Sequence, residues 1–151
     1  MIIKIYTDGA ASGNPGPGGY GVVMQSEKGH VKELSGGFKC TTNNRMELLA
    51  VIVGLAEIKA PGHNVEVVSD SKYVVDAINK GWLRGWVTKG FKGKKNPDLW
   101  KKLLPLLDLH KPRFTWVKGH NNHPQNERCD ALAVEASKGK NLPEDTGYIK
   151  S

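Results

Sequence analysis

The sequence predicts one α/β domain in which helices cover the faces of a mixed β-sheet. Three observations carry this prediction. Strand-like segments separated only by turns open the chain, which is typical of antiparallel pairing. A strand, a helix, a strand and a helix then follow one another, and such a crossover pairs its strands in parallel. The chain has 151 residues, of which 38% are hydrophobic and 25% charged, so its size and composition fit an ordinary globular domain.

The first part of the chain is expected to form three strands. Residues Ile2–Thr7 alternate and are rich in β-branched side chains, which indicates a strand. Residues Tyr20–Gln25 and Val31–Phe38 predict two further strands, joined by a turn near Lys28-Gly29. The Gly- and Pro-rich segment Gly13–Gly19 predicts a loop by its composition.

Helices dominate the rest of the expected structure. The first helix is predicted over Asn44–Lys59 and ends before Pro61-Gly62, which is a stop signal. The elements expected after it are strand Val65–Ser69, helix Ser71–Asn79, a short helix Trp82–Val87, helix Asp98–Leu109 with a kink at Pro105, strand Phe114–Val117, helix Asn126–Lys138 and a polar tail from Gly139. In such sheets reactive groups gather beyond the carboxyl ends of the strands, so we look for the site there.

The charge distribution indicates a polyanionic partner. The net charge is +7, and the segment from residue 81 to residue 96 contains no acidic side chain. The basic side chains of this segment are Arg84, Lys89, Lys92, Lys94 and Lys95, with Trp82, Trp86 and Phe91 among them. Cations for phosphates next to aromatic surfaces for sugars or bases favour nucleic-acid binding.

Other classes of protein are disfavoured. No apolar stretch is long enough to span a bilayer, and the first residues lack the pattern of a secretory signal. Cys40 and Cys129 form no Cys-x-x-Cys pair, which argues against a redox motif, and two free thiols fit a reducing compartment. We therefore expect a cytoplasmic protein, and a monomer because no obligate protein partner is evident.

Two acidic residues follow predicted strands. Asp8 ends the first strand and Asp70 ends the fourth, so parallel pairing would bring both carboxylates to one edge of the sheet. Each has a simpler interpretation. Asp8-Gly9 is a common turn pair, and Asp70 could cap the helix that begins at Ser71.

Two more acidic residues lie on apolar helix rows. Glu47 shares a row with Val51, Gly54 and Ile58, and a carboxylate on such a row is costly without a compensating partner. The simpler interpretation is a capping box in which Glu47 reaches back to Asn44. Asp130 repeats the pattern on a row with Ala133 and Val134.

Four converging carboxylates predict a metal site. They would repel one another strongly without cations, and ligation by oxygen alone suits magnesium or manganese. Two such ions, about 3.5–4 Å apart, can clamp both oxygens of a phosphoryl displacement.

The segment before Asp130 carries histidines. His120 lies in a loop rich in Asn and His, where it could transfer protons, although a surface histidine without a role is an equal interpretation. His120, His123 and Cys129 also suggest zinc, but their spacing matches no familiar zinc pattern.

Seven short motifs are spread along essentially the whole chain, at Tyr6-Thr7-Asp8-Gly9, Gly13–Gly21, Thr41–Leu48, Ser69–Val74, Trp116–His120, Asn126–Asp130 and Glu144–Tyr148. These motifs and their order resemble type 1 ribonuclease H, most of all the bacterial enzymes with a basic protrusion. The resemblance implies a five-stranded mixed sheet, first antiparallel and then parallel, flanked by helices. It also implies a single domain over residues 1–151, with a protrusion at 81–96 and a tail at 139–151.

The resemblance also implies the activity and its residues. Asp8, Glu47, Asp70 and Asp130 would hold two magnesium ions, and His120 matches a mobile histidine that assists proton transfer or product release. The family cuts the RNA strand of RNA–DNA hybrids endonucleolytically and leaves 5′-phosphate and 3′-hydroxyl ends.

The resemblance implies substrate contacts as well. Asn14, Asn43 and Asn44 match positions that contact the minor groove and the ribose hydroxyls, although each could instead be a turn or cap residue. The other implied contacts are Thr42 and Asn96 in a pocket for a DNA-strand phosphate, and Tyr73, Trp82 and Trp86 in a channel for DNA sugars.

The chain departs from some relatives at three places. Cys40 replaces an arginine two positions before Thr42, and Lys72 replaces a glutamine after the Asp-Ser pair. The protrusion is rich in glycine, at Gly81, Gly85, Gly90 and Gly93. Cys40 removes one cation from the phosphate pocket, and Lys72 alters one minor-groove contact. The glycines are expected to make the protrusion more mobile than in relatives.

Rival interpretations remain open at this point. A different nuclease on the same fold would cut duplex DNA instead of hybrid. A non-catalytic binding module would lack at least one of the four acids, whereas all are present. A nucleotide-binding loop at Gly13–Gly21 lacks the Gly-Lys-Ser/Thr signature and the helix that should follow it.

Overall fold

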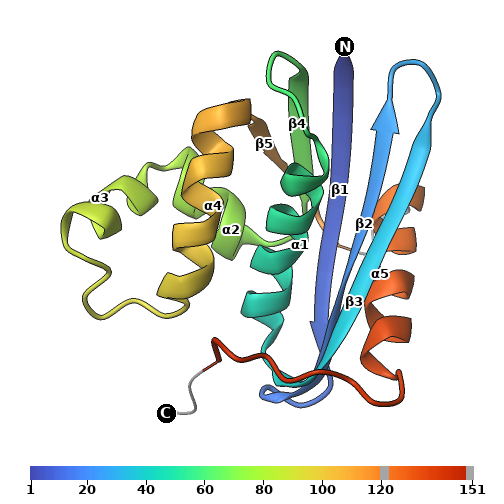
Figure 1. Ribbon diagram of the computed structural model, residues 1–151, viewed down its shortest axis with the longest axis vertical. Coiled ribbons are helices and arrows are strands. Elements are labelled where there is room, and N and C mark those ends of the chain that lie inside the picture. The colour runs from blue at the N-terminus through green and yellow to red at the C-terminus, as the bar shows by residue number, and fades with distance from the viewer. Residues whose placement is uncertain (120–122, 149–151) are drawn as a thin grey trace.

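A five-stranded mixed sheet forms the centre of the computed structural model, which describes residues 1–119 and 123–148 (Figure 1). The strands are β1 (Ile2–Ala11), β2 (Gly16–Ser26), β3 (Val31–Thr41), β4 (Asn64–Ser69) and β5 (Arg113–Trp116). Their order across the sheet is β3-β2-β1-β4-β5. β1 pairs antiparallel with β2, which pairs antiparallel with β3, whereas the pairs β1–β4 and β4–β5 are parallel. The predicted mixed sheet is therefore confirmed.

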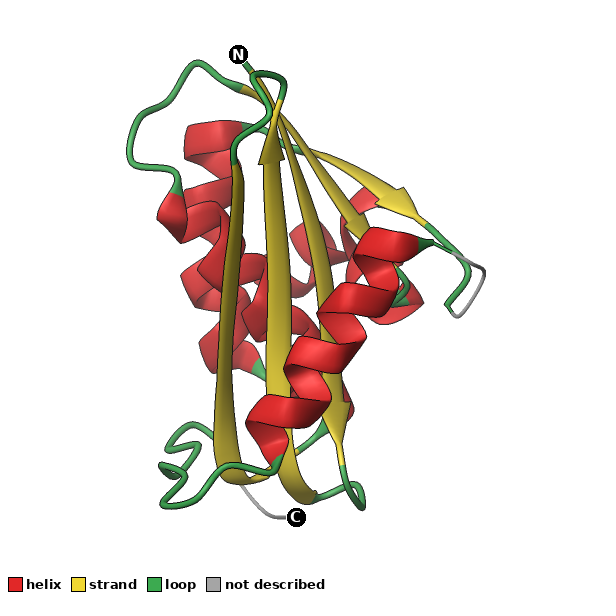
Figure 2. Cartoon of the chain, turned by 90° about the vertical axis from the view of Figure 1, so that its right-hand side faces the viewer, coloured by secondary structure: helices red, strands yellow, loops and turns green. Residues whose placement is uncertain are grey.

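Helices cover both faces of this sheet. They are α1 (Asn43–Glu57), α2 (Lys72–Asn79), α3 (Trp82–Thr88), α4 (Pro97–His110) and α5 (Pro124–Ser137). α5 lies on one face, against β1, β2 and β3, while α1 packs on the other face with α4 against it (Figure 2). α3 and the segment after it project sideways from the body of the molecule (Figure 1). Within residues 1–119 and 123–148, no helix has the length and apolarity that a membrane crossing requires.

Alternating side chains of β1 give each face its own core. Ile3 and Ile5 point into the larger cluster, which includes Leu48, Val51 and Trp100 from α1 and α4. Tyr6 faces the other way and joins a smaller cluster beneath α5, together with Val23, Val68, Cys129 and Leu132. β1 is therefore buried on both faces in the middle of the sheet, from Ile5 to Asp8.

The first four strands are longer than predicted, whereas β5 has the predicted length and is shifted by one residue. β1 continues to Ala11 and β2 begins at Gly16, so the predicted loop Gly13–Gly19 was wrong over its second half. The glycines there serve close packing. A Cβ at Gly19 would lie 2.4 Å from the carbonyl oxygen of Ala133, and one at Gly21 would lie 2.2 Å from that of Cys129. Glycine thus lets α5 approach β2 backbone to backbone.

Helix boundaries differ from the predicted ones by one or two residues. Thr42 is the N-cap of α1, since its Oγ1 accepts a hydrogen bond of 3.2 Å from the amide of Arg45. Ser71 caps α2 in the same way, through the amide of Val74 at 3.3 Å. α4 continues through Pro105. The segment after α5 runs back along β3, where the amide of Lys39 donates to the carbonyl of Pro143 at 2.9 Å.

Replacing Gly21 by alanine should destabilise the protein by roughly 2–4 kcal/mol, because the added methyl group must push α5 away from β2. The measurement is urea-induced unfolding followed by circular dichroism. Gly85→Ala in α3 is the matched control, since a Cβ there meets nothing within 4 Å. The control should be neutral or slightly stabilising because alanine favours helix. Equal stability of the two variants would contradict the packing role of Gly21.

Candidate active site

Three carboxylates from different elements meet at the edge of the sheet. Asp8, Glu47 and Asp70 each offer an oxygen atom, and these oxygens lie within 4.8 Å of one another. Thr7 and Ser69 form the last parallel pair between β1 and β4, so Asp8 and Asp70 both stand one residue beyond it. Their predicted meeting is observed. The prediction that Asp8 ends its strand was wrong, because β1 continues along β2 after β4 has ended.

Glu47 reaches the cluster from α1. The amide of Gly9 lies between two acids, 2.9 Å from Oδ1 of Asp8 and 3.0 Å from Oε1 of Glu47. A Cβ at Gly9 would lie 2.4 Å from the amide nitrogen of Glu47, so glycine is what allows α1 to lie this close to β1. The contact with Gly9 excludes the capping box, in which Glu47 would turn back to its own helix.

Burial makes this cluster electrostatically costly. Burial raises the pKa of Asp8 from 3.8 to about 7; the neighbouring carboxyl of Glu47 lowers it somewhat, and the charge of Asp70 raises it further. The pKa of Glu47 lies well above its usual value of 4.5, first because of burial and then because of the charge of Asp8. Full ionisation of the three acids therefore needs a counter-charge.

The donor set fits a hard divalent cation. Oε2 of Glu47 is buried and has no hydrogen-bond partner within the described part of the chain, although the neighbouring Oε1 is bonded. A buried carboxylate oxygen without a partner, on a residue that belongs to a group of three carboxylates, is the arrangement that oxygen-ligated cations complete. The simpler interpretation of Asp70 as a helix cap is wrong, since Ser71 caps α2.

Asp130 approaches from the other face of the sheet. It is half-buried on α5; of the residues on its predicted row, Ala133 is buried and Val134 is half-buried. Its charge contributes to the raised pKa of Asp8, but it does not belong to the group of three that lies within 4.8 Å. His120, predicted to act here, lies outside the described residues.

The zinc interpretation finds no support in the described residues. Cys129 is fully buried, and burial raises the pKa of its thiol to about 12, which opposes the thiolate that zinc requires. The ring of His123 packs against Tyr6 with 5.5 Å between ring centroids. Among residues 1–119 and 123–148, the only candidate metal group is that of Asp8, Glu47 and Asp70.

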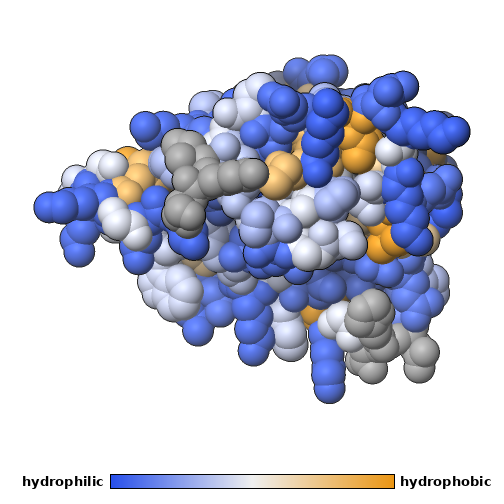
Figure 3. All heavy atoms as spheres, turned by 90° about the horizontal axis from the view of Figure 1, so that it is seen from below, coloured by the Kyte–Doolittle hydropathy of each residue, from blue (hydrophilic) through white to orange (hydrophobic). Residues whose placement is uncertain are grey.

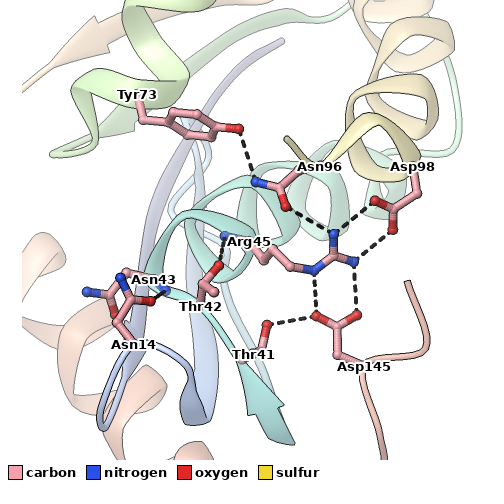
Figure 4. A network of polar contacts seen from close by, with 9 residues as sticks. All are labelled: Asn14, Thr41, Thr42, Asn43, Arg45, Tyr73, Asn96, Asp98 and Asp145. Atoms are coloured by element: carbon pink, nitrogen blue, oxygen red, sulfur yellow. Dashed lines mark hydrogen bonds and ion pairs between the residues drawn. The ribbon is translucent and has the colours of Figure 1, made fainter. Parts of the chain in front are cut away.

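An ion-pair network, which the sequence did not reveal, surrounds the buried Arg45 of α1, the helix that also carries Glu47 (Figure 4). The guanidinium of Arg45 is 2% exposed and binds Asp98 at 2.7 and 2.9 Å. It also binds Asp145 of the C-terminal segment at 2.7 and 2.9 Å, and Asp145 accepts a further bond from Thr41 at 2.7 Å. One signal was present in the sequence: Arg45, like Glu47, interrupts the otherwise apolar run from residue 45 to residue 56.

This network fixes the predicted phosphate pocket. The amide oxygen of Asn96 accepts from Arg45 at 3.2 Å, and its nitrogen donates to the hydroxyl of Tyr73 at 3.1 Å. Thr42 and Asn96 line one hollow of about 520 Å³, together with Asn14, Asn44, Lys94 and Lys95 among others. Because Thr42 Oγ1 accepts from the helix, its hydroxyl hydrogen stays available for a ligand. The predicted residues Asn14 and Asn43 also meet here, by a 3.1 Å bond.

The segment from residue 81 to residue 96 forms a second, larger hollow of about 820 Å³. Its lining is Gly81, Trp82, Gly85, Trp86, Lys89, Lys92 and Lys94. Trp82 is 47% exposed, whereas Trp86 packs edge-on against Trp100, with 5.5 Å between centroids. The ammonium of Lys94 lies 5.1 Å from the Trp86 ring. Seen from below, this projecting part is largely hydrophilic (Figure 3).

Solved structures define the class of protein. LC9-RNase H1, a type 1 enzyme with a type 2 active-site motif, superposes with a TM-score of 0.81 at 30% identity over 99% of this chain and 77% of that one. LC11-RNase H1, solved with an RNA/DNA hybrid, gives a TM-score of 0.65 at 32% identity over 89% of this chain and 95% of that one. The architecture is that of a type 1 ribonuclease H.

Sequence relatives give the family. The RNase H family model matches residues 2–138. A ribonuclease H of Desulforamulus reducens is 60% identical over 148 residues, covering 95% of this chain and 92% of the relative. One of Trichodesmium erythraeum is 56% identical over 151 residues, covering 97% and 95%. The chain belongs to the RNase H family, and the enzymatic assignment made from the sequence is confirmed.

Replacing Asp8 by asparagine should stabilise the protein when a chelator is present. The folded protein holds a proton on Asp8 up to about pH 7, whereas an unfolded aspartate loses it near pH 3.9. Stability of the wild type should therefore fall as the pH rises from about 4 to 7.

The gain in Asp8→Asn should be near zero at pH 4 and reach roughly 1–3 kcal/mol above pH 7. Thermal and urea unfolding across this pH range measures it. A gain that does not depend on pH would show that Asp8 is not strained by burial.

Asp145→Asn should destabilise the protein by about 2–4 kcal/mol, since it leaves part of the buried charge of Arg45 uncompensated. Glu144→Gln is the control, because Glu144 is exposed and should change stability by less than about 0.5 kcal/mol. Urea unfolding of both variants measures the difference. Equal midpoints would mean that the C-terminal segment contributes nothing to this network.

Proposed function

We propose that this enzyme is an endonuclease that hydrolyses the RNA strand of RNA–DNA hybrids with magnesium, for which manganese can substitute. The observation that carries the proposal is the meeting of Asp8, Glu47 and Asp70, with a buried oxygen of Glu47 left without a partner in the described chain. Membership of the RNase H family supports it, and so does the hybrid bound by LC11-RNase H1.

The carboxylates are proposed to hold two ions, with Asp130 joining the three gathered acids from the α5 side. Divalent cations there supply a counter-charge for the reacting phosphate and lower the pKa of water. The contribution of the protein is positional. Gly9 orients Asp8 and Glu47, and the backbone of β4 sets Asp70. His120 is proposed to carry a proton at the same edge, and the products are proposed to end in 5′-phosphate and 3′-hydroxyl groups.

Recognition of the hybrid is proposed to use both hollows. The free hydroxyl hydrogen of Thr42 and the oriented amide of Asn96 suit a phosphate of the DNA strand. Asn14, Asn43 and Asn44, gathered at the start of α1, suit the minor groove, where the 2′-hydroxyl distinguishes RNA.

The second hollow is proposed to hold the DNA strand further along the duplex. Its lysines suit phosphates, and Trp82 and Trp86 suit sugars. Tyr73 connects residues of the two hollows: its hydroxyl accepts from Asn96 and, at 3.1 Å, from Trp100, whose ring packs against Trp86. The segment 81–96 acts in this proposal as a basic arm of a single domain.

The enzyme is proposed to work in the cytoplasm as a monomer. Cys40 and Cys129 are both free thiols, which suits a reducing compartment such as the cytoplasm. A monomer that needs no protein partner stays a prediction.

Asp70→Asn should lower hybrid cleavage by at least about a thousandfold, because it weakens ligation of the ions that carry the chemistry. Hybrid binding should persist, since the proposed docking residues lie in the two hollows. Asp108→Asn, an exposed acid on α4, is the matched control and should cleave normally.

The measurement is an end-labelled assay with hybrid, duplex DNA, duplex RNA and single strands, each with magnesium or with chelator. Cleavage of the RNA strand in the hybrid alone, and only with magnesium, is expected. Cutting of duplex DNA in preference to hybrid would establish a different nuclease on the same fold.

A further inference from the structure

Lys72, one of the departures from relatives, lies immediately beside the carboxylate cluster. It is the first residue of α2 and stands two positions after Asp70. The side chains of Lys72 and Tyr73 diverge. The hydroxyl of Tyr73 bonds to Asn96 in the pocket, whereas the ammonium of Lys72 lies 4.6 Å from the ring centroid of Trp116 on the β5 side. Lys72 is thus placed on the side of the cluster away from the phosphate pocket.

The indole ring of Trp116, which this ammonium contacts, is held in place by two interactions. Trp116 ends β5 and pairs with Ser69, the residue before Asp70. Its indole Nε1 donates a hydrogen bond of 3.0 Å to the carbonyl oxygen of Asp70. The ring is 41% exposed, so the contact with Lys72 lies at the surface. Backbone pairing and the indole bond therefore tie the position of the ammonium to that of Asp70.

The ammonium is available for an external anion. Lys72 is exposed, and it forms no ion pair with any carboxylate of residues 1–119 and 123–148. Contact with an aromatic face restricts the long side chain without neutralising its charge. Part of the entropy that a free lysine loses on binding is therefore lost already in the unbound protein.

The position of Lys72 indicates which strand it contacts. A strand that is cut at the cluster must pass Asp70, and the Cα atoms of residues two apart in the chain are separated by at most about 7 Å. That span is similar to the distance between successive phosphates of a nucleic-acid strand. A compact, strongly hydrated point charge such as an ammonium suits a phosphate oxygen better than the paired donor and acceptor of a base edge.

We propose that Lys72, seated on Trp116, binds a backbone phosphate of the RNA strand next to the cleaved bond. This inference rests on the proposed function and adds to it a contact with the cut strand. A contact of this kind recognises charge and does not depend on the base sequence of the hybrid. Trp116 is the positioning residue of the pair.

The first test compares Lys72→Gln with Lys28→Gln. Both remove one exposed lysine, but Lys28 lies in the turn between β2 and β3, at the other end of the sheet from Asp8. Hybrid binding is measured in chelator over a range of salt concentrations. Lys72→Gln should reduce the slope of log Kd against log salt by about 0.7–0.9, the value of one phosphate contact. Lys28→Gln should leave the slope unchanged. Equal slopes in both variants would overturn the proposal.

The second test identifies the strand. Uncharged methylphosphonate linkages are placed singly along the RNA strand or the DNA strand near the cut position. One RNA-strand position should weaken binding by the wild type about 3- to 10-fold but have no effect on Lys72→Gln. Coupling to a DNA-strand position, or to none, would refute the assignment. Failure of the wild type to cleave hybrid is a separate result, which removes the proposed function itself.

Variants of Trp116 test its positioning role. Trp116→Leu should lose most of the coupling between Lys72 and the RNA phosphate, whereas Trp116→Phe should retain much of it because the aromatic face remains. A purely structural role would lower stability in both variants and leave the coupling intact. Circular dichroism and urea unfolding confirm that each variant is folded before its coupling is measured.

Discussion

The amide of Gly9, shared between the carboxylates of Asp8 and Glu47, is the contact on which the rest of the site depends. Its two distances of 2.9 and 3.0 Å exist only because α1 can lie where a side chain on residue 9 would clash. One amide cannot neutralise two buried acids that also face Asp70, and the pKa values of Asp8 and Glu47 rise accordingly. The fold thus holds together charges that repel, and a cation is the partner that resolves this conflict.

Two further packing arrangements hold the surroundings of that contact. On one face, glycines of β2 let α5 lie close enough for the charge of Asp130 to reach Asp8. On the other, Arg45 links α1 to Asp98 of α4 and to Asp145 of the C-terminal segment. The same arginine orients Asn96 in the hollow proposed for a DNA-strand phosphate. The proposed catalytic and binding groups therefore share α1: Glu47 belongs to the carboxylate cluster, and Arg45 holds Asn96 in the hollow.

Local patterns in the sequence predicted much of this site. Parallel pairing implied that Asp8 and Asp70 would meet, and the apolar row of Glu47 implied that its carboxylate would be buried. The strand lengths escaped prediction because the glycines at the start of β2 serve the approach of a helix, although their composition is that of a loop. The Arg45–Asp145 pair escaped because its partners lie 100 residues apart, which no local period reports. Thr42 rather than Asn44 caps α1, a choice between neighbouring polar residues that only the backbone decides.

The most direct test of the central claim is calorimetric titration of magnesium into the protein at pH 7, repeated in buffers with different enthalpies of ionisation. The dependence of the heat on the buffer gives the number of protons released on binding. Because Asp8 and Glu47 both have raised pKa values, the account predicts net release of protons as the cation binds. Magnesium binding without any proton release would contradict the claim that the cation relieves a strained, partly protonated cluster.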